Sequence, residues 1–204
     1  MTPAYVLDTS LFTNPDVFRQ FGVDTRAAIR EFVHIAQASG AAFYMPTSIY
    51  EELCQMKELD GVAPAFESLV NIRSPRRHEL QIPATIVYEF IDEVRRRIDR
   101  GLRIAEEHAR QGHAAGGGDV GQLISRLRER YREALRRGLI DSREDLDVLL
   151  LAMELDGIVV TADEGLRIWA DKLGVKILLP EHLKGVLLEL VERQVEEGAG
   201  DDAG

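Results

Sequence analysis

Four acidic residues lie far apart in the chain but in similar local settings, each beside a short apolar run. They are Asp8 after AYVL, Glu52 after FYMPTSIYE, Asp145 at the start of DLDVLLLA and Asp163 after GIVVTA. Such runs, alternating with amphipathic stretches, predict a parallel α/β sheet, whose strands bring ligands to their carboxyl ends. Four converging carboxylates repel one another, so the pattern predicts a hard divalent cation, Mg²⁺ or Mn²⁺, among them.

Each acid taken alone also has a simpler explanation. Asp163 could cap the helix DEGLRIWADKLG, and Asp8 could stabilise the turn DTSLFTNP through its side chain. Ser10 and Thr161, however, place hydroxyls next to two of the carboxylates, where they could support metal-bound water or a phosphate oxygen. The joint pattern therefore favours a metal site.

Composition predicts one catalytic domain with an elaboration. The 204 residues, 45% of them hydrophobic, suffice for one sizeable core and a subdomain. The single Cys54 excludes an intramolecular disulfide, and the five scattered histidines lack the spacing of zinc ligands. Because we find neither a signal-like N-terminus nor an apolar run of membrane-spanning length, we expect a cytoplasmic protein with no membrane partner.

The charge distribution is strongly uneven. Residues 95–137 contain 12 Arg, no Lys and 6 acids, a net charge of +6. Since the whole chain carries −10, the remainder carries −16. A basic block in an acidic protein predicts a polyanionic partner. The exclusive use of arginine favours bidentate contacts with phosphates.

The basic block predicts a helical hairpin at 83–137, broken at Gly112 and at the glycines 116–118. Arginines form two helical rows, one of Arg128, Arg132 and Arg136 and a neighbouring one of Arg126 and Arg130. These rows are either a polyanion-binding face or a solvated face paired with local glutamates. The apolar positions, which include Val87, Phe90, Ile91 and Ile98 on the first helix, pack either within the hairpin or on another subunit.

The rest of the chain predicts an α/β/α sandwich from residues 1–82 and 138–196. We expect four strands, near 4–8, 41–45, 158–162 and 175–179, with the hairpin inserted between the second and third. Ser142 is the expected cap of the helix that carries Asp145. The acidic tail 197–204 is expected to be disordered.

Several segments resemble a known nuclease family. DTS after the first strand, a Glu before an apolar residue on the next helix, and G-x3-VTAD are similar to the PIN nuclease domain. More narrowly, DTSLFTNP, MPTSIYEEL, the Arg-rich hairpin and SREDLDVLLLAMELDGIVVTADEGL resemble the protein-only ribonuclease P of some bacteria and archaea, the homologs of Aquifex RNase P.

The resemblance implies a role for each matching acid. Asp8, Asp145 and Asp163 match the first, third and fourth PIN acids, and Glu52 fits the second better than Glu51. Asp141 matches a further aspartate that the family needs, as a catalytic, metal-facing or supporting acid. Asp147 lies two residues after Asp145, so we expect it to reach the metals only from the edge of the cluster or through water.

The resemblance also implies an activity. It is metal-dependent removal of the 5′ leader from precursor tRNA, giving a 5′-phosphate and a 3′-hydroxyl without an RNA subunit. The family is further expected to form large homo-oligomers through the hairpin. A toxin-type PIN ribonuclease that cuts single-stranded RNA, and a non-catalytic binding or assembly module, remain as alternatives.

Overall fold

The chain forms two compact units, which are described separately. The computed structural model describes residues 3–56, 59, 61–114, 119–136 and 142–201. One unit comprises Met1–Leu80 and Ser142–Gly204, and the other comprises Gln81–Asp141. The first carries the segments that resemble the PIN nuclease domain and is called the nuclease unit, and the second is called the hairpin unit.

The nuclease unit is built on a parallel five-stranded sheet in the order β3-β2-β1-β4-β5. Its strands are β1 Ala4–Leu7, β2 Ala42–Met45, β3 Val70–Ile72, β4 Ile158–Val160 and β5 Lys176–Leu178. The predicted parallel α/β fold is confirmed, but the prediction of four strands was wrong. The edge strand β3 has only three residues, too few to show an alternating pattern. The hairpin insertion therefore lies between the third and fourth strands along the chain.

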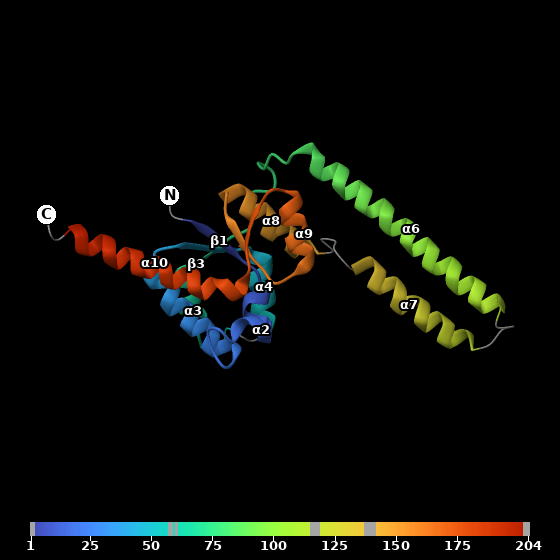
Figure 1. Ribbon diagram of the computed structural model, residues 1–204, viewed down its shortest axis with the longest axis horizontal. Coiled ribbons are helices and arrows are strands. Elements are labelled where there is room, and N and C mark those ends of the chain that lie inside the picture. Colours follow the sequence, from blue (N-terminus) through green and yellow to red (C-terminus); the bar gives the residue numbers. More distant parts are fainter. Residues whose placement is uncertain (1–2, 57–58, 60, 115–118, 137–141, 202–204) are drawn as a thin grey trace. The chain divides into compact units, whose positions relative to one another are not determined.

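Helices cover both faces of this sheet (Figure 1). They are α1 Ser10–Thr13, α2 Pro15–Phe18, α3 Thr25–Ser39, α4 Thr47–Gln55, α5 Ala63–Leu69, α8 Arg143–Leu155, α9 Glu164–Lys172 and α10 Pro180–Asp201. Helix α3 packs against α5 and α10 on one face, whereas α8 packs on β1, β4, α4 and α9. Right-handed crossovers place α3 and α5 on one face and α9 on the other, because the chain moves from β1 towards β3 and later from β4 towards β5.

The predicted helix boundaries have clear local causes. Asp24 accepts a hydrogen bond from the Ala27 amide at 2.8 Å at the start of α3, and Gly40 ends that helix with a φ of 63°. Ser142 accepts one from the Asp145 amide at 2.9 Å and begins α8 as expected. Helix α10 continues to Asp201, so it enters the tail that composition predicted to be disordered.

The core of the nuclease unit is rich in phenylalanine between the sheet and α3. Phe32 lies at the centre, with ring centroids 5.4 Å from Phe12 and 5.3 Å from Phe43 in edge-to-face geometry. Phe66 adds a further edge-to-face contact with Phe12 at 5.7 Å. On the other side, the single tryptophan, Trp169 of α9, is buried.

The hairpin unit consists of α6, Ala84–Ala114, and α7, Val120–Arg136, lying side by side (Figure 1). Small residues let the helices approach closely. A Cβ atom on Gly101 would lie 2.7 Å from Cε2 of Tyr131, and one on Gly112 would lie 2.9 Å from Cδ2 of Leu123. Ile104 and Ala134 are buried at this seam.

The predicted apolar stripe of α6 does not form the seam. Val87, Phe90, Ile91 and Ile98 are all exposed in the single chain, as is Leu102. Packing within the hairpin therefore does not account for these side chains. None of the described helices combines the length and the apolar character needed to cross a membrane.

Candidate active site

The side chain of Asp8 is the centre of a hydrogen-bond network at the carboxyl end of β1. It is buried, with 4% of its surface exposed. Its Oδ1 accepts a hydrogen bond from the Thr9 amide at 2.8 Å. Its Oδ2 accepts from the Ser10 hydroxyl at 2.6 Å and from the Thr161 hydroxyl at 2.8 Å. Donors of this kind hold the carboxylate in one orientation.

The same two hydroxyls shape the loop after β4. Ser10 Oγ accepts a hydrogen bond from the Ala162 amide at 2.9 Å, and Thr161 Oγ1 accepts one from the Asp163 amide at 3.0 Å. Asp163 then caps α9 by accepting from the Leu166 amide at 2.8 Å. The network therefore fixes the backbone of Asp163 relative to the carboxylate of Asp8.

The four predicted acids line one hollow of about 440 Å³ in the nuclease unit. Asp8, Glu52, Asp145 and Asp163 all border it, and so does Ser10. The hollow lies at the carboxyl ends of β1 and β4, which are neighbours in the sheet although the chain leaves them in opposite directions. This is the topological switch point, where open parallel sheets bind their ligands.

Glu52 rather than Glu51 contributes to the hollow. Glu51 is exposed and is not among its lining residues. Burial, followed by the charges of Asp8 and Glu144, raises the pKa of Glu52 above its ordinary value. Negative charge is therefore already crowded here, and a cation would relieve it.

Four further residues line the hollow that sequence reasoning did not propose: Thr9, Thr13, Ser142 and Glu144. Glu144 directly precedes Asp145 in the first turn of α8, where a carboxylate is also expected simply to stabilise the helix. Because this common role already accounts for Glu144, its sequence position gave no reason to predict it at the site.

Asp147 occupies a different environment. It is 2% exposed and does not line the hollow. Arg77 Nε donates to its Oδ1 at 3.0 Å, Arg77 Nη2 donates to Oδ2, and the Ser48 hydroxyl donates to Oδ2 at 2.9 Å. Both carboxylate oxygens are thus engaged by protein donors.

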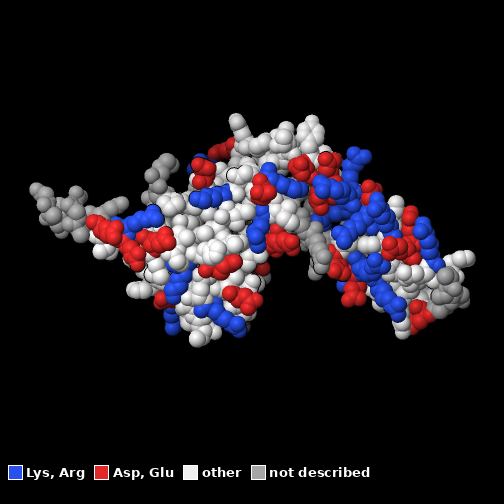
Figure 2. All heavy atoms as spheres, in the orientation of Figure 1, with Lys and Arg blue, Asp and Glu red and all other residues white. Residues whose placement is uncertain are grey.

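Arginines are concentrated on the hairpin unit, where basic atoms dominate much of the visible surface (Figure 2). Arg126, Arg128, Arg130 and Arg132 of α7 are all exposed. Arg130 forms an ion pair with Glu107 of α6 at 3.0 Å, and Arg126 donates to Gln122 Oε1 at 3.3 Å. Local pairing therefore holds part of this surface in place without covering it.

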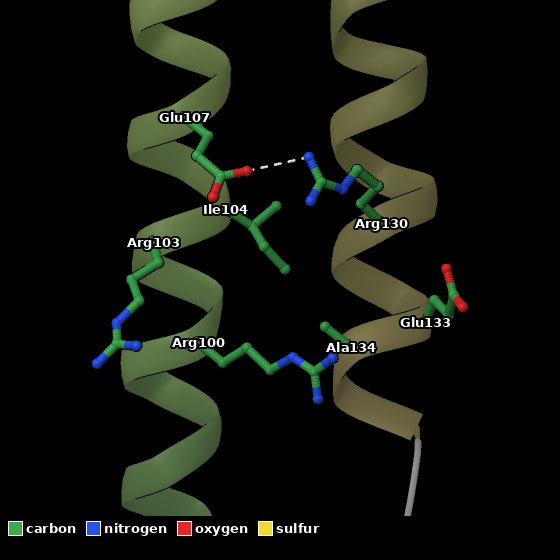
Figure 3. Close-up of a pocket in the computed structure, with 7 residues that line it drawn as sticks. All are labelled: Arg100, Arg103, Ile104, Glu107, Arg130, Glu133 and Ala134. Atoms are coloured by element: carbon green, nitrogen blue, oxygen red, sulfur yellow. Dashed lines mark hydrogen bonds and ion pairs between the residues drawn. The ribbon is translucent and has the colours of Figure 1, made fainter.

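A pocket of about 280 Å³ lies between the two helices beside this ion pair (Figure 3). Arg100 reaches from α6 towards α7 and ends near Ala134, while Arg103 points away from α7. Three arginines and two glutamates line the pocket, which is therefore net positive and large enough for a phosphate group.

Comparison with known proteins connects these features. The PINc domain ribonuclease model matches residues 4–192. A protein of Nitrosococcus oceani named RNA-free ribonuclease P is 60% identical over 187 residues, 91% of this chain and 94% of that one. A protein of the same name from Halorhodospira halophila is 52% identical over 200 residues, which are 98% of this chain and 93% of that one. Another, from Pyrococcus horikoshii, is 44% identical over 191 residues, which are 93% of each chain.

This chain belongs to the RNA-free ribonuclease P family. The predicted resemblance is confirmed, as are the PIN-type fold and the assignment as an endoribonuclease. The matches include the hairpin as well as the nuclease unit, because they cover more than nine tenths of the chain.

Some of the predicted site residues lie outside the described part of the chain. They are Asp141, which precedes the cap of α8, and the side chain of Arg136 at the end of α7. Within the described residues, no three His, Cys, Asp or Glu side chains already surround a single metal position. The acids thus line a common hollow, but those that the structure describes are not arranged as a complete set of ligands around one metal position.

Proposed function

We propose that this chain removes the 5′ leader of precursor tRNA by hydrolysis that leaves a 5′-phosphate and a 3′-hydroxyl, without an RNA subunit. The observation that carries the proposal is the joint placement of Asp8, Glu52, Asp145 and Asp163 around one hollow at the sheet's switch point. The names of the relatives support it. A match that spans both units disfavours the alternative of a minimal toxin-type nuclease, and a complete set of acids disfavours a non-catalytic module.

The donor set fits a divalent cation of the hard, oxygen-binding kind. Every acidic lining residue offers a carboxylate, and Ser10 and Thr161 add hydroxyls nearby. Burial, followed by the charges of Asp8 and Glu144, raises the pKa of Glu52. Within the proposal the cation is Mg²⁺ or Mn²⁺, held by Asp8, Glu52, Asp145 and Asp163. When bound, such a cation acidifies a water molecule and stabilises negative charge on the leaving oxygen.

The chain's own residues supply orientation. Ser10 and Thr161 donate to Oδ2 of Asp8 and so hold its carboxylate in place beside the hollow that it lines. Asp163 and Asp145 sit at the starts of α9 and α8, which place both carboxylates at the edge of the hollow. Asp141 remains part of the proposal as a catalytic or supporting acid. We omit Asp147 from the ligands, because its buried side chain pairs with Arg77 and does not line the hollow.

The hairpin unit is the proposed RNA-binding element. Arg126, Arg128, Arg130 and Arg132, with Arg136, would contact phosphates of the folded tRNA, since recognition of such RNA relies on shape and backbone. The exposed stripe of α6 would join copies of the chain into a homo-oligomer.

Cleavage of a 5′-labelled precursor tRNA by the purified protein tests this function. We expect one cut at the mature 5′ end in Mg²⁺ or Mn²⁺ and none in excess EDTA. Cutting within single-stranded loops instead would favour the toxin-type alternative, and RNA binding without any cleavage would favour the non-catalytic one.

A further inference from the structure

The buried carboxylate of Asp147 joins three segments of the nuclease unit. Asp147 belongs to α8, Ser48 belongs to α4, and Arg77 belongs to the segment after β3. Hydrogen bonds of 2.9 Å from Ser48 and 3.0 Å from Arg77 Nε meet on this one side chain. We refer to these three residues as the Asp147 junction.

The two helices in the junction are those that carry acids into the hollow. Glu52 lies four residues after Ser48 on α4, hence on the same helix face. Asp145 lies two residues before Asp147 on α8. Because Ser48 donates directly to Asp147, the junction fixes the separation between the segments that present Glu52 and Asp145.

The junction depends on Arg77 for its charge balance. Asp147 is almost fully buried, and a buried carboxylate needs a cationic or hydrogen-bonding partner. The Arg77 side chain supplies two donors and keeps 56% of its own surface exposed. Removing it would leave the carboxylate with the Ser48 hydroxyl as its remaining side-chain donor among the described residues, and α8 would shift or Asp147 would turn outward.

We infer that Arg77 and Asp147 are positioning residues for the metal site, which hold Glu52 and Asp145 at the separation that the cation requires. The inference rests on the proposed metal site and extends it to two residues that do not touch the hollow. It also explains why an acid so close to Asp145 is absent from that hollow.

Arg77→Ala tests the inference, with Arg76→Ala as the matched control. Arg76 is the adjacent arginine, exposed at 69%, and its side chain pairs with Glu79 and Glu154 at 3.6 Å rather than with Asp147. The control therefore removes the same charge from the same segment. Single-turnover cleavage of a precursor tRNA is measured across a Mg²⁺ titration, and RNA affinity is measured with Ca²⁺ replacing Mg²⁺.

For Arg77→Ala we expect a maximal rate lower by about tenfold or more, and a Mg²⁺ concentration for half-maximal rate higher by a similar factor. RNA affinity should stay within about twofold of wild type, since misplacing metal ligands does not remove phosphate contacts. Arg76→Ala should match wild type in all three quantities. Arg77→Lys should recover part of the rate because it restores a cation beside Asp147.

Two results would overturn the inference. One is a Mg²⁺ titration of Arg77→Ala that coincides with that of Arg76→Ala. The other is lost RNA affinity with an unchanged rate at saturation, which would make Arg77 a direct RNA contact. If Arg77→Ala fails to fold, judged by Trp169 fluorescence, Ser48→Ala gives the same test through the other donor. Wild-type cleavage that needs no divalent cation would instead refute the proposed metal site itself.

Discussion

Replacing Thr161 by valine tests the network that joins Asp8 to Asp163. The two side chains have nearly the same shape, and Thr161 is fully buried. Valine removes the hydroxyl that donates to Asp8 at 2.8 Å and accepts from the Asp163 amide at 3.0 Å. A hydrogen bond to a charged group contributes about 1.5–3 kcal/mol and a neutral one about 0.5–1.5 kcal/mol. We therefore expect the free energy of unfolding to fall by about 2–4.5 kcal/mol.

The single tryptophan makes this loss measurable in the nuclease unit. Trp169 is buried in α9 of that unit, so its fluorescence during urea denaturation reports unfolding there. The measurement is made in EDTA to remove the contribution of bound cation. Thr13→Val is the control, because its hydroxyl makes a local hydrogen bond to the Thr9 carbonyl at 3.0 Å. Thr13→Val should lower the free energy of unfolding by about 1 kcal/mol or less. Equal losses in the two variants would refute the idea that Thr161 organises the site.

Three further predictions concern charge and assembly. Arg132→Ala should reduce the steepness of the fall in log affinity for precursor tRNA with log salt concentration by about one unit. Arg193→Ala, on the nuclease unit, should leave this slope unchanged. If Arg132→Ala has the same slope as wild type, the arginine row of α7 is only a solvated surface. Because the folded-state pKa of Glu52 is raised, its ionised form costs stability at neutral pH, so Glu52→Gln in EDTA should be more stable than wild type at pH 7. The gain should disappear as the pH falls below the pKa of glutamate in the unfolded chain; a gain independent of pH would contradict this cause. Ile98→Glu should lower the mass measured by light scattering towards that of the 22.9 kDa monomer, and an unchanged large mass would exclude the α6 stripe as the interface.

The placement of three candidate acids, Asp8, Asp145 and Asp163, could be predicted because each lies just after a strand or at a helix start. Asp8 and Asp163 come immediately after apolar runs that form β1 and the neighbouring β4, and parallel topology brings their carboxyl ends together. Ser142 was recognisable as a cap from its spacing to Asp145.

Other features depend on contacts that a sequence pattern does not encode. The partners of Asp147 lie 70 and 99 residues away in the chain, at Arg77 and Ser48, so its burial could not be foreseen from its distance to Asp145. Strand β3 was missed because its three residues follow α5 without an interruption. The seam of the hairpin is set by Gly101 against Tyr131, whereas Phe90, Ile91 and Ile98 of α6 are exposed.

The most direct test of the account is cleavage of one precursor tRNA by wild type and by Asp145→Asn, with the 5′ end of the product mapped. Asp145 lines the hollow, and its amide is bonded to Ser142, so the substitution preserves the helix cap while removing the charge. We predict that wild type cuts at the mature 5′ end only with a divalent cation. Asp145→Asn should retain the RNA affinity and Trp169 fluorescence of wild type, but its cleavage rate should fall by at least about a hundredfold. Undiminished cleavage by Asp145→Asn, or full wild-type cleavage in excess EDTA, would contradict the central claim that these acids form the metal-dependent active site.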